Sequence, residues 1–372
     1  MKHLQEYRNR DQVCSLNARI HARTTQPWTL MEICGGQTHA ILRFGIDQML
    51  PAGLTLIHGP GCPVCVTPAE MIDAAVQIAH LPGIVLCTFG DMLRVPGTAG
   101  TSLYTAKARG ADVRFVYSPI DVVRMAESQP DRCFVFFGVG FETTAPAQAL
   151  AVLQAERLGL RNFFLLGSLV RVLPAIEALL GEADCRLDGL LAAGHVCAIT
   201  GFEEYRQLAQ DYQVPINVTG FEPTDILRGI LGCVTQLEEG RAEVENNYER
   251  SVRSAGNRHA REMIHQVFEV CDRAWRGLGP IAQSGLRLRA AYHPFDALQH
   301  FEVRPLTDAP ATTCISGKIL RGQARPCECP AFGSSCTPEM PLGAPMVSGE
   351  GACAAYFRYA RPAAPLPEVL RK

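Results

Sequence analysis

Two cysteines separated by two residues lie in the turn Gly59-Pro60-Gly61-Cys62-Pro63-Val64-Cys65. An apolar segment typical of a β-strand precedes the turn. The sequence predicts a helix after it, with Thr67 as N-cap, Pro68 at the first helical position and Glu70 completing a capping box. The positive end of a helix dipole stabilises a thiolate, so this pair suits thiol–disulfide exchange or half of a zinc site. Because the chain has no second CxxC to complete a four-cysteine zinc site, a redox pair is the favoured interpretation.

A third sulfur lies upstream, in the segment Cys34-Gly35-Gly36-Gln37-Thr38-His39. The glycines give the thiol of Cys34 little cover and allow backbone N–H groups to approach a ligand. A soft thiolate there could bind iron or attack an electrophile. A buried cysteine followed by a helix-capping histidine is the plainer interpretation. Because the segment ends a predicted strand next to the CxxC turn, we expect Cys34 and His39 to lie beside Cys62 and Cys65.

The C-terminal part of the chain is rich in glycine and proline and carries five further cysteines. Such a loop-like stretch has little use for thiols in core packing, so we expect a metal site. Four thiolates serve either zinc or an iron–sulfur cluster. The spacings fit neither a zinc ribbon nor a bacterial ferredoxin, so they leave the metal open. The five residues are Cys314, Cys327, Cys329, Cys336 and Cys353.

Size and composition narrow the class of protein. The chain has 372 residues, 47% hydrophobic and 19% charged, which is enough for two or three globular domains. A net charge of −2, with no basic stripe, argues against nucleic acid as a partner. No apolar stretch of about 18 residues predicts a membrane span, and the polar start lacks a signal peptide. We therefore expect a cytoplasmic protein, whose fifteen cysteines do not form a disulfide framework.

Short apolar runs alternate with predicted helices from Trp28 to about residue 235, which predicts an α/β protein with parallel sheets covered on both faces. A recurring Gly-Phe-Glu turn indicates two similar βα-repeat domains facing a cleft, at 28–128 and 129–235. Residues 1–27 and 236–372 are assigned to a third, mainly helical and loop-like domain, in which 238–275 is charged and helix-favouring. The expected strands are 29–33, 54–57, 83–89, 113–117, 133–137, 163–166, 189–193 and 216–218.

Ligands in such sheets bind beyond the carboxyl ends of the strands, where Cys34, Cys62, Asp91, Glu142 and His195 all fall. Each of the three residues without sulfur is individually more typical of a helix cap or a satisfied polar group than of a catalyst. The chain has no phosphate-binding loop and no complete dinucleotide fingerprint. A nucleotide-dependent enzyme is therefore not expected.

Taken together, these motifs resemble those of the HypD family of hydrogenase maturation proteins, over nearly the whole chain. The order of the shared segments makes the resemblance specific. Besides the two cysteine turns, the segments are Phe89–Gly97, Gly140–Pro146, Ala193–His195, Gly220–Pro223, Trp275–Gly279 and Met346–Ala355.

The resemblance implies assembly of the Fe(CN)2(CO) unit of [NiFe]-hydrogenases, with a small HypC-type chaperone and cyanide delivered by a HypE-type donor with HypF. It implies two α/β domains around a cleft and a third domain with a [4Fe-4S] cluster in the region 314–353. Carried over by motif, Cys34 would bind the iron transiently, Cys62 and Cys65 would be redox-active, and His39 would line the cleft. The protein would be a scaffold with redox activity rather than a conventional turnover enzyme.

The chain departs from the family pattern in the cluster region. Many members have Cys-x-Cys-Gly where this chain reads Cys314-Ile315-Ser316-Gly317. Cysteines 329, 336 and 353 match the pattern, and we assign Cys314 as the fourth ligand, ahead of Cys327 and of the Ser316 oxygen. Loss or weak retention of the cluster is the alternative. Gln37, where many members have histidine, is a milder change.

A second class of function fits the same residues. A stand-alone cytosolic thiol–disulfide oxidoreductase would use the CxxC pair, with a structural metal in the C-terminal stretch.

Overall fold

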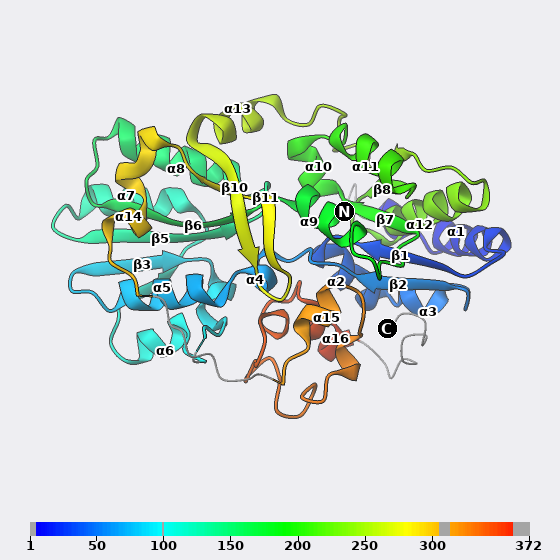
Figure 1. Ribbon diagram of the computed structural model, residues 1–372, viewed down its shortest axis with the longest axis horizontal. Coiled ribbons are helices and arrows are strands. Elements are labelled where there is room, and N and C mark those ends of the chain that lie inside the picture. Colours follow the sequence, from blue (N-terminus) through cyan, green and yellow to red (C-terminus); the bar gives the residue numbers. More distant parts are fainter. Residues whose placement is uncertain (1–4, 99, 305–312, 360–372) are drawn as a thin grey trace.

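The computed structural model describes residues 5–98, 100–304 and 313–359, arranged around two sheets that lie side by side along the long axis (Figure 1). Sheet A is wholly parallel, with the strand order β2-β1-β7-β8-β9. Its strands are β1 (Trp28–Glu32), β2 (Leu54–His58), β7 (Gly189–Ala193), β8 (Ile216–Thr219) and β9 (Val244–Asn246).

Sheet B has the order β10-β11-β6-β5-β3-β4 and is parallel from β6 to β4, while β10 and β11 run antiparallel at one edge. Its strands are β3 (Ile84–Thr88), β4 (Val113–Phe115), β5 (Cys133–Gly140), β6 (Phe163–Val170), β10 (Phe268–Trp275) and β11 (Gly279–Leu288).

Helices cover both faces of the central part of sheet B, which explains why β3, β5 and β6 read as continuous apolar runs. Phe134 and Phe136 of β5 point into a core with α7 and α8, whereas Val135 and Phe137 point into a core with α5. The longer helices are α1 (Arg10–Arg23), α2 (Gly35–Phe44), α5 (Ala69–Ala79), α7 (Pro119–Ser128), α8 (Ala145–Arg157), α9 (Val172–Leu180), α11 (Glu204–Tyr212), α12 (Pro223–Glu238), α13 (Arg258–Val267) and α16 (Ala352–Tyr359).

Several short helices complete the fold, and two of them, α4 and α10, carry residues of the site described below. They are η1 (Gln5–Arg8), α3 (Ile46–Met49), α4 (Pro63–Val66), η2 (Gly90–Arg94), α6 (Leu103–Ala108), α10 (Gly194–Thr200), η3 (Ala290–Phe295), α14 (Ala297–His300), α15 (Ser316–Leu320), η4 (Pro326–Glu328) and η5 (Ala344–Met346).

The predicted mixed α/β class with two parallel-dominated sheets is confirmed, and each of the eight expected strands is present within a few residues. The sheets do not divide at residue 128, however. Strands β1 and β2 belong to sheet A and β3 and β4 to sheet B, after which β5 and β6 extend sheet B and β7 and β8 return to sheet A. Apolar periodicity shows that a strand is buried but not which strand lies beside it, so the sequence did not reveal these crossovers.

The predicted helix-favouring stretch 238–275 contains only one full helix, α13, and ends in a strand. Strands β10 and β11 form a hairpin whose turn holds Gly277 and Gly279 at φ values of 82° and 85°, and β11 pairs with β6. Strand β10 lies at the edge of sheet B, where one face is exposed and tolerates charged residues. These charged residues led the sequence analysis to predict a helix.

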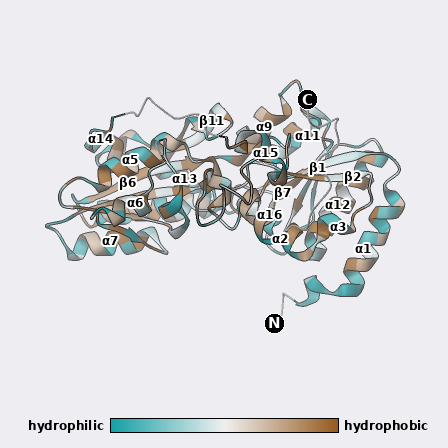
Figure 2. Cartoon of the chain, turned by 90° about the horizontal axis from the view of Figure 1, so that it is seen from below, coloured by the Kyte–Doolittle hydropathy of each residue, from teal (hydrophilic) through white to brown (hydrophobic). Residues whose placement is uncertain are grey.

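The N-terminal helix α1 packs against α12 beside sheet A, through Leu16 and Ile20. The assignment of residues 1–27 to a third domain with 236–372 stays a prediction. Most of its remaining surface is hydrophilic (Figure 2). Within the described ranges, no helix combines the length and apolarity needed to cross a membrane.

Residues 313–359 lie beneath the junction of the two sheets, next to α2 and α4 (Figure 1). This position puts the C-terminal cysteines on the same side of the molecule as the turns that follow β1 and β2.

Candidate functional site

The carboxyl ends of β1 and β2 bring two of the predicted cysteine motifs together. The strands pair in parallel register with Glu32 opposite His58, so the turns that follow them start at the same edge of sheet A. The Gly35 N–H donates to the Gly61 carbonyl at 3.0 Å, which places Cys34 next to Cys62. All three sulfur-bearing residues are buried, with exposed fractions of 3% for Cys34, 4% for Cys62 and 1% for Cys65. The structure thus gathers the three cysteines, whereas their chemical roles stay predictions.

Gly61 allows this close approach because it has no side chain. A Cβ atom at Gly61 would overlap the backbone N and Cα of Cys34. Glycine is therefore needed at position 61 because the backbone of the other cysteine turn lies where a side chain would be, in addition to any local requirement.

Cys62 and Cys65 form a disulfide across α4, with their Cα atoms 5.2 Å apart. Cys62 is the N-cap of α4, and its Sγ accepts a hydrogen bond from the Cys65 N–H at 3.3 Å. The predicted capping box at Thr67 is wrong. The Thr67 hydroxyl donates to the Pro63 carbonyl at 2.8 Å, because a short helix already occupies the CxxC segment, and α5 begins at Ala69.

His195 completes this group from a segment near the middle of the chain. It lies in the first turn of α10, directly after β7, and its Nδ1 is 3.7 Å from the Sγ of Cys34. Burial raises the pKa of the Cys34 thiol and lowers that of His195 to about 4, so a neutral thiol faces a neutral imidazole at pH 7. From sequence, His195 was noted at a strand end, but its pairing with Cys34 was missed.

A buried carboxylate supports the Cys34 turn from below. Glu32 is fully buried; it accepts the Cys34 N–H at 2.8 Å and the Thr38 hydroxyl, and its Oε1 lies 2.6 Å from Nδ1 of His58. Burial raises the pKa of Glu32, and its hydrogen bonds with His58 and Thr38 oppose that rise. Sequence reasoning missed both Glu32 and His58. The signal available was an ionisable residue at the end of each of two adjacent apolar strands.

His39 lies on α2 but faces the C-terminal segment. Its Nδ1 is 3.2 Å from the Gly349 carbonyl oxygen, and its Nε2 is 3.4 Å from the Tyr359 hydroxyl. Both ring nitrogens therefore contact the region that carries Cys353. The predicted role of His39 in a cleft remains a prediction.

Four of the C-terminal cysteines approach one another. Cys353 lies in the first turn of α16, and its pKa is raised by burial and, further, by the proximity of Cys314, Cys336 and Cys329. Cys327 is exposed; partial burial and then Glu328 raise the pKa of its thiol, whereas Arg325 lowers it. No three ligating side chains in the described ranges are gathered tightly enough for a single metal ion, and none of these cysteines is in a disulfide.

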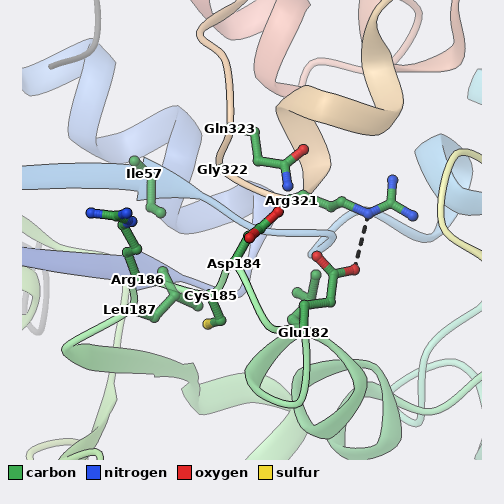
Figure 3. Close-up of a pocket in the computed structure, with 10 residues that line it drawn as sticks. Ile57, Glu182, Asp184, Cys185, Arg186, Leu187, Arg321, Gly322 and Gln323 are labelled. Atoms are coloured by element: carbon green, nitrogen blue, oxygen red, sulfur yellow. Dashed lines mark hydrogen bonds and ion pairs between the residues drawn. The ribbon is translucent and has the colours of Figure 1, made fainter. Parts of the chain in front are cut away.

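A separate pocket lies between residues 182–187 and the Arg321–Gln323 segment that follows α15 (Figure 3). It encloses about 420 Å³, part of it open to solvent, and an ion pair at 3.0 Å joins Glu182 to Arg321 beside it. Its described lining includes none of the predicted site cysteines. The cysteine site is therefore a buried junction of turns and not this pocket.

Comparison with known proteins agrees with these motifs. A family model for HypD, described as "Hydrogenase formation hypA family", matches residues 11–360. The chain belongs to the HypD family of hydrogenase maturation factors. Among its relatives is the hydrogenase maturation factor HypD of Azotobacter vinelandii, 45% identical over 97% of both chains.

Two further HypD relatives show the same extent of similarity. The factor from Escherichia coli K12 is 45% identical over 96% of this chain and 98% of its own length. The factor from Rhodobacter capsulatus is 47% identical over 94% of this chain and 93% of its own length. The likeness thus covers both sheets and the C-terminal cysteine region.

Proposed function

We propose that this HypD-family chain is a scaffold for assembly of the Fe(CN)2(CO) unit of [NiFe]-hydrogenases. In this proposal it works with a small HypC-type chaperone and receives cyanide from a HypE-type donor that acts with HypF. Family membership supports the link to hydrogenase maturation. The observation that carries the assignment to particular residues is the contact of buried Cys34 with half-buried His195, beside the Cys62–Cys65 disulfide.

Cys34 is the residue we assign to the iron. A thiolate is a soft ligand that suits iron carrying cyanide and carbon monoxide, and a thiol must lose its proton to become one. The Nδ1 atom of neutral His195 is positioned to accept that proton. Burial of Cys34 keeps water away from the iron, which favours an iron–cyanide–carbonyl fragment over an aqueous ion.

Cys62 and Cys65 are assigned to electron transfer. Reduction of their disulfide takes two electrons and two protons and yields two thiols, and oxidation returns them. The turn that carries the pair is hydrogen-bonded to the turn that carries Cys34. A change in the redox state of the pair therefore takes place next to the proposed iron ligand.

A [4Fe-4S] cluster is proposed for the C-terminal cysteines. In support, Cys314, Cys329 and Cys336 are near enough to Cys353 to add to the rise that burial causes in its pKa, and four thiolates are the usual ligands of such a cluster. This grouping favours Cys314 over Cys327 as the fourth ligand. When bound, the cluster would carry single electrons.

A thiol–disulfide oxidoreductase acting without partners is the second candidate, and the disulfide favours it. Against it, exposed fractions of 4% and 1% leave the pair inaccessible to a large protein disulfide. Turnover of a model disulfide by the isolated chain would support this second function.

The deciding experiment is anaerobic co-purification with a HypC-type chaperone, followed by infrared spectroscopy of the cyanide and carbonyl stretching region. We expect bands from the wild type and none from Cys34→Ala. Cys87→Ala is the matched control, because Cys87 is equally buried but lies in β3 of sheet B. Unchanged bands in Cys34→Ala would refute the assignment.

A further inference from the structure

A chain of buried hydrogen bonds runs from the C-terminal helix to the backbone of Cys34. The Tyr356 hydroxyl lies 3.2 Å from Nε2 of His58, and Nδ1 of the same ring lies 2.6 Å from Glu32 Oε1. The second carboxyl oxygen of Glu32 accepts the Cys34 N–H at 2.8 Å. Tyr356 belongs to α16, the helix that also carries Cys353.

The members of this chain have little freedom to move separately. Their exposed fractions are 0% for Glu32, 6% for His58 and 5% for Tyr356. A buried polar group that loses its hydrogen-bond partner is strongly disfavoured, so the three side chains hold one another in place. Edge-to-face packing of the His58 and Tyr356 rings, with centroids 5.4 Å apart, adds a second contact at the same point.

The C-terminal segment also contacts α2, the helix that follows Cys34. The Gly349 carbonyl and the Tyr359 hydroxyl contact the two ring nitrogens of His39 on α2. Gly35 packs so closely on the Glu350 carbonyl that a Cβ atom there would overlap it. The start of α2, where Cys34 is the N-cap, is therefore fixed from outside sheet A by residues 349–359.

We propose that Tyr356 and His58 are positioning residues for Cys34, through which the C-terminal cysteine region sets the orientation of that thiol. Neither side chain contacts the sulfur in the described structure; both act through Glu32. When α16 is packed in place, Tyr356 contacts His58, His58 contacts Glu32, and Glu32 accepts the Cys34 N–H. When α16 is displaced, His58 loses its contact with Tyr356, and the turn that carries Cys34 is held less firmly. The inference rests on the proposed function only for the role of iron at Cys34.

The test is the rate at which iodoacetamide alkylates Cys34 in the anaerobic full-length protein, followed by mass spectrometry of the Cys34 peptide. Tyr356→Phe keeps the ring and removes the hydroxyl. We expect alkylation of Cys34 to be about fivefold faster than in the wild type, because the variant lacks one buried hydrogen bond. Tyr292→Phe is the control, because Tyr292 is similarly buried but lies in η3 beside sheet B; its rate should equal that of the wild type.

His58→Gln provides a second variant, and the double variant with Tyr356→Phe should be no faster than the faster single one, since both act through one chain. An unchanged rate in Tyr356→Phe, an equal increase in Tyr292→Phe, or additive effects in the double variant would each overturn the proposal.

Unfolding temperature, iron content and sulfide content are measured on the same samples. A faster rate without change in these quantities separates positioning from general loss of structure. The readout needs no iron at Cys34, so it stays informative even if the infrared experiment refutes that role.

Discussion

The Sγ atom of Cys34 lies 3.7 Å from Nδ1 of His195, although 161 positions separate the two residues in the chain. Parallel pairing of β1 with β7 produces this contact, because Cys34 and His195 each follow the carboxyl end of one of these strands. A thiol must lose its proton to bind a metal, and burial opposes that loss at Cys34, so the imidazole beside it is the base that we assign to assist it.

Replacement of His195 should therefore slow the reactions of Cys34. In His195→Gln we expect alkylation of Cys34 by iodoacetamide to fall about tenfold, since the group that accepts the thiol proton is gone. Because burial lowers the pKa of His195 to about 4, the imidazole stays neutral and the ratio of the two rates should stay constant from pH 6 to 8. His265→Gln, on the exposed side of α13, is the control. A ratio near one would contradict the role of His195.

Gly61 should tolerate no side chain. Gly61→Ala places a methyl group on the backbone of Cys34, and we expect a loss of about 1–3 kcal/mol in the free energy of unfolding, measured with urea. Gly90→Ala is the matched control, because a Cβ atom there meets no described atom within 4 Å. Equal stability of the two variants would show that the turns separate easily.

The fourth cluster ligand can be identified by two single substitutions. We expect Cys314→Ser to lose most of the iron and sulfide of anaerobically purified protein, whereas Cys327→Ser keeps the wild-type content. The reason is that Cys314 lies near Cys353 while Cys327 is exposed and has different neighbours. Full retention in Cys314→Ser, with loss in Cys327→Ser, would reverse the assignment. A colourless wild type containing zinc would refute the cluster itself.

Glu142 should make the protein less stable as the pH rises toward neutrality. Burial raises its pKa from 4.5 to about 7; its Oε1 accepts the Val172 N–H at 3.0 Å, and its Oε2 has no partner among the described residues. The folded protein holds this proton more tightly than the unfolded chain. The resulting stabilisation is complete below pH 4.5 and is lost as the pH rises through 7, by about 3 kcal/mol.

Glu142→Gln should remove that contribution. We expect the difference in unfolding free energy between pH 5 and pH 8, measured with urea, to shrink by about 3 kcal/mol relative to the wild type. Glu127→Gln is the control, because Glu127 is exposed on α7. If Glu142→Gln and the wild type respond equally to pH, the carboxyl is ionised throughout.

The sequence alone was sufficient for the eight expected strands and for the family, but it did not reveal the β10–β11 hairpin. Runs such as Leu54–Ile57 and Gly189–Ala193 predicted their strands, because residues buried on both faces of a parallel sheet are apolar throughout. The cysteine turns were recognisable because glycine and proline restrict the backbone locally. Their placement at strand ends was enough to expect Cys34 beside Cys62, since β1 and β2 are consecutive strands.

Only the tertiary structure decided which strands share a sheet, and with that the partners of Cys34. His195 reaches the sulfur through β7, and Tyr356 reaches the Cys34 backbone through His58 and Glu32. These contacts join segments more than a hundred residues apart. Local propensity and periodicity report how each segment is buried, whereas the choice of neighbour depends on packing across the whole chain, which no single segment encodes.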